Sequence, residues 1–149
     1  MQKINIEIEQ LSHFEGLDLP RYMTSESAGM DLVAAVIDEV ILDPMEIKLI
    51  PTGLKMAIPS GYEAQIRPRS GLALKYGISL PNSPGTIDAD YRGEIGIIMQ
   101  NLGQEPFVVR RGERIAQLVV AAVVQGKFEV VSKLSETARG TGGFGSTGK

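Results

Sequence analysis

The sequence predicts an all-β fold of many short strands, in the β-sandwich, jelly-roll or barrel class. Apolar side chains alternate with polar ones in many short runs, which is the pattern of half-buried strands. Turn-forming residues separate these runs at intervals of roughly 8–12 residues. The 17 glycines and 8 prolines among 149 residues also favour many tight connections, and this length indicates one domain with a sizeable core.

The first fifty residues are expected to contain four short strands and one loop. Alternating isoleucines predict a strand at 4–8, and the mixed segment 11–27 predicts the loop. The run 28–35 fits either a helix or a strand, and its glycine, its brevity and its neighbouring turns favour a strand. Two further strands are expected on either side of Asp43-Pro44.

The middle of the chain predicts two hairpins and a helical segment. Residues 54–58 and 62–66 alternate on either side of Pro59-Ser60-Gly61, which predicts the first hairpin. Residues 70–75 contain good helix formers and predict at least one helical turn. The second hairpin is predicted at 82–94, which contains the turn signals Ser-Pro-Gly and Tyr-Arg-Gly-Glu.

The second hairpin carries two carboxylates. Alternation places Asp88 and Asp90 on one face and Ile87 and Ala89 on the other. Two carboxylates beside a closed turn indicate a small cleft with an anionic floor. Because aspartates in turns often bond to their own backbone, this pair alone does not establish a site.

The C-terminal third is expected to contain four strands and a glycine-rich tail. The strands are expected at 95–99, 107–110, 115–124 and 128–131. Valine and isoleucine in 115–124 favour a strand buried on both faces. The tail, 139–149, has too many glycines to hold structure by itself. It is expected to be either a disordered end or a segment that folds over a ligand, with N–H groups and hydroxyls facing phosphate.

Composition limits the possible chemistry. The absence of cysteine excludes disulfides, thiol nucleophiles and cysteine–zinc sites, and it fits a cytoplasmic protein. The single histidine, His13, is expected at the surface, so a histidine-based triad is excluded and any general base is expected to be a carboxylate. The net charge of −3 gives no global attraction to nucleic acid or membrane. The N-terminal residues lack the apolar block of a signal peptide, and the longest apolar run, 115–124, is too short to span a bilayer.

Five segments together resemble the five ordered motifs of the trimeric deoxyuridine triphosphatases (dUTPases). They are the segment 82–94, Ala28-Gly29-Met30-Asp31-Leu32, Pro68-Arg69-Ser70-Gly71-Leu72, Arg111-Gly112-Glu113-Arg114-Ile115-Ala116-Gln117-Leu118 and the glycine-rich tail. They follow the family's order and spacing, and the similarity covers nearly all of the chain from Ala28 onward. The resemblance implies a distorted jelly roll with at most one short helix over 1–138, and an arm at 139–149 that closes over the active site.

The resemblance also implies a reaction and an assembly. Water attacks the α-phosphorus of dUTP and releases dUMP and pyrophosphate, with Mg²⁺ held by the triphosphate. This activity keeps uracil out of DNA and supplies dUMP for thymidylate synthesis. The implied assembly is a homotrimer with three sites at subunit interfaces, each built from residues of all three chains.

The resemblance assigns to segment 82–94 the contacts with the attacking water, the deoxyribose and the base. Asp88 matches the family's water-activating carboxylate, which orients a water and accepts its proton. Tyr91 matches the residue whose ring packs on the deoxyribose and leaves no room for a 2′-hydroxyl. Asn82 matches a position at the uracil edge, where a closed hairpin would also clash with the 5-methyl of thymine. Tyr91 and Asn82 also fit purely structural roles in the turn. The remaining residues assigned to substrate binding here are Gly85, Thr86 and Ile87.

Three other motifs are assigned to the phosphates and the metal. The second motif supplies the phosphate-binding residues Arg69, Ser70 and Gly71, and arginine suits this role because its planar fork grips two oxygens. Gln117 matches a polar residue that faces the phosphates, although a structural hydrogen bond to backbone would equally explain an amide in an apolar strand. Asp31 matches a carboxylate that acts on Mg²⁺ through water, since Mg²⁺ tends to keep its waters. Arg114 is expected to form a buried structural ion pair.

The tail completes the implied site. Phe144 matches the ring that closes over the uracil, a stacking contact worth typically ~1–3 kcal/mol. Arg139 matches a catalytic arginine that reaches the γ-phosphate end. The remaining tail residues assigned to the substrate are Gly145, Ser146 and Thr147.

Two alternatives belong to other classes. A dCTP deaminase-related enzyme would need a glutamate on the strand after the second hairpin, and residues 96–101 contain no carboxylate. A non-catalytic nucleotide-binding jelly roll on the same scaffold would have no use for Asp88, Arg139 and Phe144.

Overall fold

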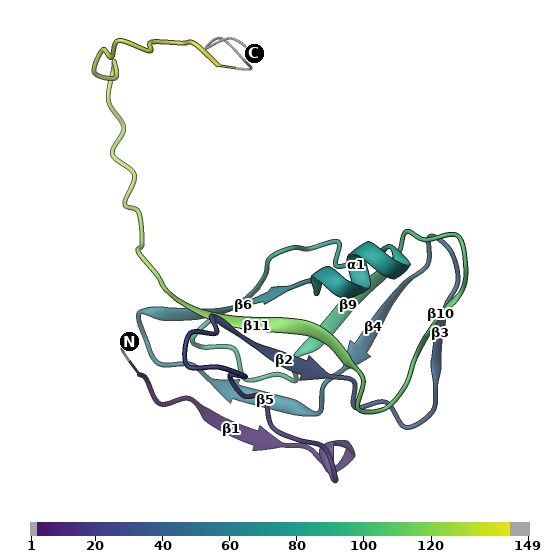
Figure 1. Cartoon of the computed structure of the whole chain (residues 1–149). Coiled ribbons are helices and arrows are strands. Elements are labelled where there is room, and N and C mark those ends of the chain that lie inside the picture. The colour runs from purple at the N-terminus through teal and green to yellow at the C-terminus, as the bar shows by residue number, and fades with distance from the viewer. Residues whose placement is uncertain (1–2, 144–149) are drawn as a thin grey trace.

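The computed structural model describes residues 3–143, which form two layers of antiparallel strands and an extended segment that leaves them (Figure 1). The strands of the first half are β1 (Glu7–Gln10), β2 (Gly29–Val33), β3 (Val40–Leu42), β4 (Ile47–Pro51), β5 (Leu54–Ala57) and β6 (Tyr62–Arg67). Those of the second half are β7 (Ile78–Ser79), β8 (Gly85–Ile87), β9 (Gly96–Asn101), β10 (Phe107–Val109) and β11 (Arg114–Ala122). The helical elements are the 3₁₀ turn η1 (Ser12–Phe14) and the helix α1 (Ser70–Tyr76).

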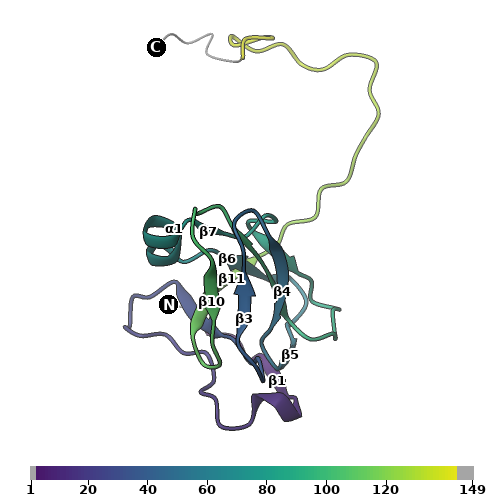
Figure 2. The ribbon, with the colours of Figure 1, turned by 90° about the vertical axis from the view of Figure 1, so that its right-hand side faces the viewer.

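One layer is the four-stranded sheet β2-β11-β6-β8, and the other is the three-stranded sheet β4-β9-β7. The two-stranded ribbons β1-β5 and β10-β3 complete the body (Figure 2). The predicted all-β jelly-roll class with one short α-helix is therefore confirmed for the residues described. No helix in this part of the chain has the length and apolar character needed to cross a membrane.

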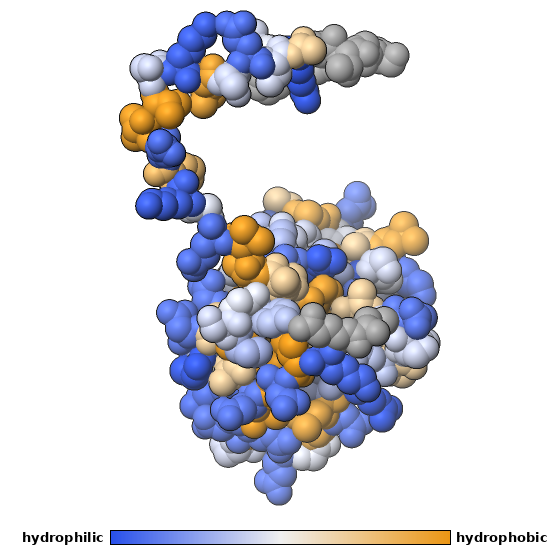
Figure 3. All heavy atoms as spheres, turned by 90° about the vertical axis from the view of Figure 1, so that its left-hand side faces the viewer, coloured by the Kyte–Doolittle hydropathy of each residue, from blue (hydrophilic) through white to orange (hydrophobic). Residues whose placement is uncertain are grey.

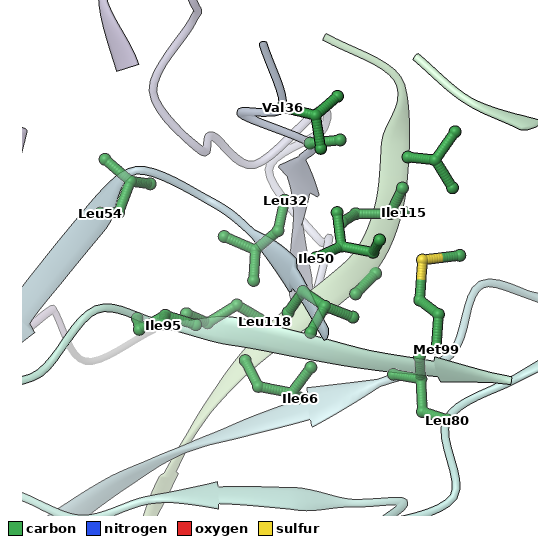
Figure 4. Packing of buried hydrophobic residues seen from close by; sticks show 14 of the residues in the cluster. Leu32, Val36, Ile50, Leu54, Ile66, Leu80, Ile95, Met99, Ile115 and Leu118 are labelled. Atoms are coloured by element: carbon green, nitrogen blue, oxygen red, sulfur yellow. The ribbon is translucent and has the colours of Figure 1, made fainter. Parts of the chain in front are cut away.

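The core lies between the two sheets, where alternate strand residues meet (Figure 4). Ile66 and Leu118 from the four-stranded sheet are buried together with Ile50 and Met99 from the three-stranded sheet. Burying one such side chain stabilises the fold by about 1.5–3 kcal/mol. The side-chain period of two correctly predicts the inward face of β5, β6 and β9, but not that of β4, where Ile47 and Leu49 are exposed and Ile50 is buried.

The helix α1 begins at Ser70 and ends at Tyr76, one residue beyond the predicted segment. Gly77 ends it in the left-handed conformation, with φ 68°, and its N–H bonds to the carbonyl of Ala73. A Cβ on Gly77 would lie 2.7 Å from the backbone N of Gly103. Both the positive φ and this close approach require glycine.

The first predicted hairpin, 54–66, is wrong. β5 pairs with β1, and β6 pairs with β11 and β8, so the turn at 59–61 carries the chain from one sheet to another. A turn signal specifies where the chain bends, whereas strand partners are chosen by the burial of distant apolar faces.

The second predicted hairpin, 82–94, is also wrong as a two-stranded unit. β8 pairs with β6, and no strand follows it before Ile95 in the part of the chain that the structure describes. The chain instead turns at Asp88, whose carbonyl accepts the N–H of Tyr91. It then docks on β5, where Ile95 N donates to the carbonyl of Leu54.

Two strand predictions near the C-terminus need correction. β11 is a strand as predicted, but it ends at Ala122, and Val119 and Val120 are only half-buried. Residues 128–131 form no strand; Phe128 and Val130 are almost fully exposed. No strand among residues 3–143 lies beside them, so their alternation has no partner to pair with in the described chain.

From Val123 onward the described chain leaves the body as an arm (Figures 1 and 2). Apolar residues lie along it in Figure 3, and Val124 and Leu134 are 93% and 80% exposed. The boundary predicted after residue 138 stays a prediction, because the end of the tail lies outside the described residues.

Candidate active site

Asp31 on β2 is the centre of a charged cluster that joins three of the five motifs. Its Oδ1 accepts from Nε of Arg69 at 3.0 Å, and its Oδ2 lies 3.2 Å from Nη1 of Arg114. Arg69 also donates from Nη1 to the backbone carbonyl of Arg114 at 3.0 Å. Because the side chain of Asp31 is only 16% exposed, these ion pairs are less screened by solvent than surface pairs.

The predicted ion pair of Arg114 is thus present, but it is not fully buried. The side chain of Arg114 is 55% exposed, while that of its partner Asp31 is mostly covered. A guanidinium with this exposure retains donors that face solvent and can receive an anion. The cluster therefore combines a fixed carboxylate with two arginines at its rim.

The register of the four-stranded sheet brings the fourth motif to the same place. Gln117 on β11 lies opposite Asp31 on β2 and opposite Arg67 on β6. Residues directly opposite one another in a sheet point to the same face, so these three polar side chains share one face. Gln117 is exposed, so its amide is open to solvent on this face of the sheet.

The second motif continues from this face into α1. Arg69 precedes the helix in an extended conformation, and Ser70 begins it. Ser70 and Gly71 are both exposed, and a Cβ on Gly71 would meet no atom within 4 Å among the described residues. The backbone at Gly71 is thus open on the side where a side chain would stand, as close approach by a ligand requires.

The third motif occupies the other edge of the same sheet. Gly85 lies opposite Ile66, and a Cβ on Gly85 would be 3.1 Å from Nδ2 of Asn82 and 3.3 Å from Cβ of Ile66. Glycine at this position therefore lets the Asn82 amide lie against the strand. Thr86 is exposed opposite Gln65, while Ile87 packs against the core.

Asp88 and Asp90 follow this strand as exposed side chains, and Ala89 between them is half-buried. Both aspartates line an open hollow of about 900 Å³ together with Glu63 on β6. The predicted alternation of faces is not seen beyond Ile87, because residues 88–90 form a turn and Ala89 lines the same hollow as the two aspartates. The described part of this hollow is acidic, so Asp88 by itself does not make a phosphate-binding site.

Tyr91 follows Asp90 in the chain and is held by its own hydrogen bond. Its hydroxyl donates to the carbonyl of Glu94 at 2.9 Å, and its ring remains partly exposed. A Cβ on Gly93 would lie 2.3 Å from the Tyr91 hydroxyl oxygen. Glycine at 93 is therefore needed for the ring to take this position.

Within one chain, Asp88 lies far from the arginine cluster. Ile87 pairs with Ala64 on β6, so Asp88 stands near Glu63, whereas Gln117 pairs with Arg67. The two positions are about four residues apart along β6, or about 13 Å at about 3.3 Å per residue. They share a face of the sheet but not a single site.

Arg139 is not brought to either group in this chain. Its Nε donates to the carbonyl of Gly142 at 2.8 Å within the arm, and the arm up to residue 143 lies away from the body (Figure 1). The predicted substrate contacts of Phe144, Gly145, Ser146 and Thr147 lie outside the described residues.

The described residues include no group of three or more carboxylate or histidine side chains that could hold a metal ion. Both oxygens of Asp31 face arginines, which disfavours direct cation binding. Mg²⁺ prefers to keep several waters and to bind substrate phosphates with one or two carboxylates. The donor set therefore fits an ion that arrives with the substrate, not one in an all-protein site.

The sequence interpretation missed the polar ladder on β6. Arg67 donates to Gln65 at 2.7 Å, and Gln65 donates to Glu63 at 2.8 Å. These residues alternate with the buried Ala64 and Ile66, so the period of two already placed them on one face. The alternation in 62–66 therefore also predicted a polar face, but only its apolar residues had been interpreted.

Comparison with known proteins agrees with this arrangement. A family model described as dUTPase matches residues 15–148. A deoxyuridine 5′-triphosphate nucleotidohydrolase of Maricaulis maris is 58% identical over 150 residues, with 99% of each chain covered. Among solved structures, the dUTPase of Staphylococcus bacteriophage 80alpha with dUPNHPP has a TM-score of 0.88 and 27% identity, covering 99% of this chain and 100% of its own.

A variant of the dUTPase from phage phi11 of S. aureus shares the fold with a TM-score of 0.79 at 23% identity, covering 89% of this chain and 100% of its own. That structure describes the coordination of a structural Mg(II) ion. The family match spans nearly the whole chain, and it includes the strands that carry Asp31 and Gln117 and the turn that carries Asp88. The chain therefore belongs to the dUTPase family.

Proposed function

We propose that this chain hydrolyses dUTP to dUMP and pyrophosphate, with Asp88 orienting the water that attacks the α-phosphorus. The observation that carries the assignment is the shared polar face, on which Asp31, Arg69 and Gln117 converge and along which Asp88 stands exposed. An exposed carboxylate on a fixed turn can hold a water and accept its proton. The arginine fork suits the bidentate grip of phosphate oxygens.

The other site residues have roles that follow from their positions. Ser70, Gly71 and Gln117 would contact phosphate from the arginine end of the face. Asn82 and the backbone of the β8 strand, including Gly85 and Thr86, would contact the uracil edge. Tyr91 would pack on the deoxyribose, and Arg139 with the residues from Phe144 to Thr147 would close over the bound nucleotide.

The active site is proposed to be shared among three copies of the chain. About 13 Å along the sheet separates Asp88 from the arginine cluster, which is too far for one chain to hold both ends of the reacting phosphate group. The arm also stands away from its own body and exposes apolar side chains such as Val124 and Phe128. A homotrimer in which different copies supply Asp88, the arginine cluster and the arm would complete each site.

Mg²⁺ is proposed to enter as part of the substrate complex. Bound to the triphosphate, it would neutralise phosphate charge and fix the conformation of the chain of phosphates. Asp31 would approach it only through water, because both of its oxygens are engaged by Arg69 and Arg114. The activity is proposed to act on free nucleotides in the cytoplasm, without nucleic acid or membrane as a partner.

The test is pyrophosphate release from dUTP, dTTP, dCTP and UTP in parallel, with Mg²⁺ and with EDTA. Release from dUTP alone, lost in EDTA, is the expected result. Equal turnover of several nucleotides would contradict the proposed selectivity of the 82–94 segment. Ammonia release from dCTP would indicate deaminase chemistry, and nucleotide binding without turnover would indicate a binding protein.

A further inference from the structure

Glu94 closes the segment that carries Asp88 and Tyr91, and its carboxylate is held at two points. Oε1 accepts the backbone N–H of Gly53 at 2.7 Å and lies 2.7 Å from Nε2 of His13. The side chains of His13 and Glu94 are 26% and 29% exposed, so this contact is largely covered. Such charge-assisted hydrogen bonds are stronger than neutral ones.

The backbone of the same residue holds Tyr91. The carbonyl of Glu94 accepts the Tyr91 hydroxyl at 2.9 Å. With glycine at 93, the ring lies back over the chain, where a Cβ would come within 2.6 Å of the ring carbon that carries the hydroxyl. The position of the Tyr91 ring therefore depends on where the Glu94 carbonyl is fixed.

The support beneath Glu94 is rigid. Thr52, which is fully buried, donates from its hydroxyl to the carbonyl of Ile95 at 2.6 Å, and Ile95 N donates to Leu54. Gly53 is buried with φ 68°, and a Cβ there would lie 2.9 Å from Cβ of Phe14. Gly53 thus has no room for a side chain, and its buried, closely packed backbone presents its N–H to the Glu94 carboxylate.

We propose that Glu94, anchored by Gly53 and His13, is a positioning residue that fixes the Tyr91 ring and so sharpens the exclusion of ribonucleotides. The inference rests on the proposed role of Tyr91 at the deoxyribose. A ring held in place rejects a 2′-hydroxyl by steric clash, whereas a ring free to swing makes room for it. Glu94 acts through Tyr91 and does not itself touch substrate.

The test compares kcat/KM for dUTP, UTP and dTTP in the full chain. Glu94→Ala removes the anchor, Glu94→Gln keeps an oxygen that accepts from Gly53, and Tyr91→Phe removes the hydroxyl alone. The double variant of Tyr91→Phe and Glu94→Ala measures whether the two residues act together. Glu105→Ala, at an exposed position on the β9–β10 connection, is the matched control.

In Glu94→Ala the preference for dUTP over UTP is expected to fall about tenfold, the scale of one lost charge-assisted hydrogen bond. The preference for dUTP over dTTP is expected to stay within about twofold of the original, because base selection uses other groups of the segment. Tyr91→Phe is expected to lower the preference for dUTP over UTP by about the same factor as Glu94→Ala. The double variant is expected to lower this preference no further than either single variant does. Glu94→Gln and Glu105→Ala are expected to retain the original preference.

Four outcomes would overturn the inference. The first is an unchanged preference for dUTP over UTP in Glu94→Ala or in Tyr91→Phe, and the second is an additive loss of that preference in the double variant. The third is a parallel loss of selection against dTTP in Glu94→Ala. The fourth is a Glu94→Gln variant that discriminates against UTP as poorly as Glu94→Ala does. If Glu94→Ala does not fold, Tyr91→Phe and Glu94→Gln still decide the matter. An original chain that releases no pyrophosphate from dUTP would overturn the proposed function too, whereas a selective original chain with an equally selective Glu94→Ala would overturn this inference alone.

Discussion

Asp31 and Arg69, 38 residues apart in sequence, are joined by an ion pair of 3.0 Å between Oδ1 and Nε. The opposite oxygen of Asp31 pairs with Arg114, so one carboxylate orients two arginines. A guanidinium held at Nε keeps its terminal nitrogens in a defined plane, which is the preorganisation that phosphate recognition needs.

Replacing Asp31 with asparagine is expected to raise the KM for dUTP about tenfold while changing kcat less, because a charge-assisted hydrogen bond to Arg69 is weakened. Steady-state kinetics over a series of Mg²⁺ concentrations provides the measurement. Asp38→Asn, at an exposed position, is the control. Recovery of the normal KM at high Mg²⁺ would show that Asp31 acts on the metal's waters and not through Arg69.

Asp88→Asn is expected to lower kcat by about 10²–10⁴-fold, since the amide cannot accept the proton of the attacking water. Nucleotide binding should persist because the arginine cluster is unchanged. Single-turnover assays and calorimetric binding of a non-hydrolysable dUTP analogue measure the two effects. Asp90→Asn, its exposed neighbour in the same hollow, is the matched control. Turnover close to normal in Asp88→Asn would remove this residue from the mechanism.

Deleting residues 139–149 is expected to abolish turnover and leave the thermal unfolding midpoint almost unchanged. The described part of this segment bonds within the arm and contributes nothing to the core. Pyrophosphate release and differential scanning calorimetry test the two halves of this prediction. A large drop in the unfolding midpoint would instead assign the segment a structural role.

Mixing Asp88→Asn chains with chains lacking 139–149 is expected to restore part of the activity. If each site takes Asp88 and the arm from different copies, some sites in mixed assemblies receive one intact copy of each. Activity should be followed after subunit exchange, with exchange verified by native mass spectrometry. Verified exchange without recovery would count against shared sites.

Asn101→Ala is expected to lower the free energy of unfolding by about 2–5 kcal/mol, because it leaves several buried backbone groups without partners. Asn101 is fully buried; its Nδ2 donates to the carbonyls of Leu42 and Glu105, and its Oδ1 accepts from Gly103. Urea denaturation measures the change, with the exposed Asn5→Ala as control. An effect below about 0.5 kcal/mol would mean that water replaces the amide.

The inward faces of most strands, though not of β4, were predictable from the sequence, whereas strand partners were not. Met56, Ile58 and Ile97 are buried as their alternation predicts, because the side-chain period of a strand is a local property of its backbone. Both predicted hairpins failed for the opposite reason. β5 and β8 pair with strands distant from their own turns, and that choice depends on which apolar faces can be buried together.

For the candidate site, too, some features were determined by the sequence and others only by the tertiary structure. By itself the sequence determined the all-β class and the short helix at Ser70, because residue spacing and helix propensity act through local backbone geometry. The dUTPase family followed from the resemblance of five ordered motifs. Only the tertiary structure decided that Asp31 binds Arg69 and Arg114, that Asp88 stands apart from them, and that Glu94 meets Gly53 and His13. These contacts join segments far apart in the chain, and they exist only once the sheet register has fixed where each segment lies.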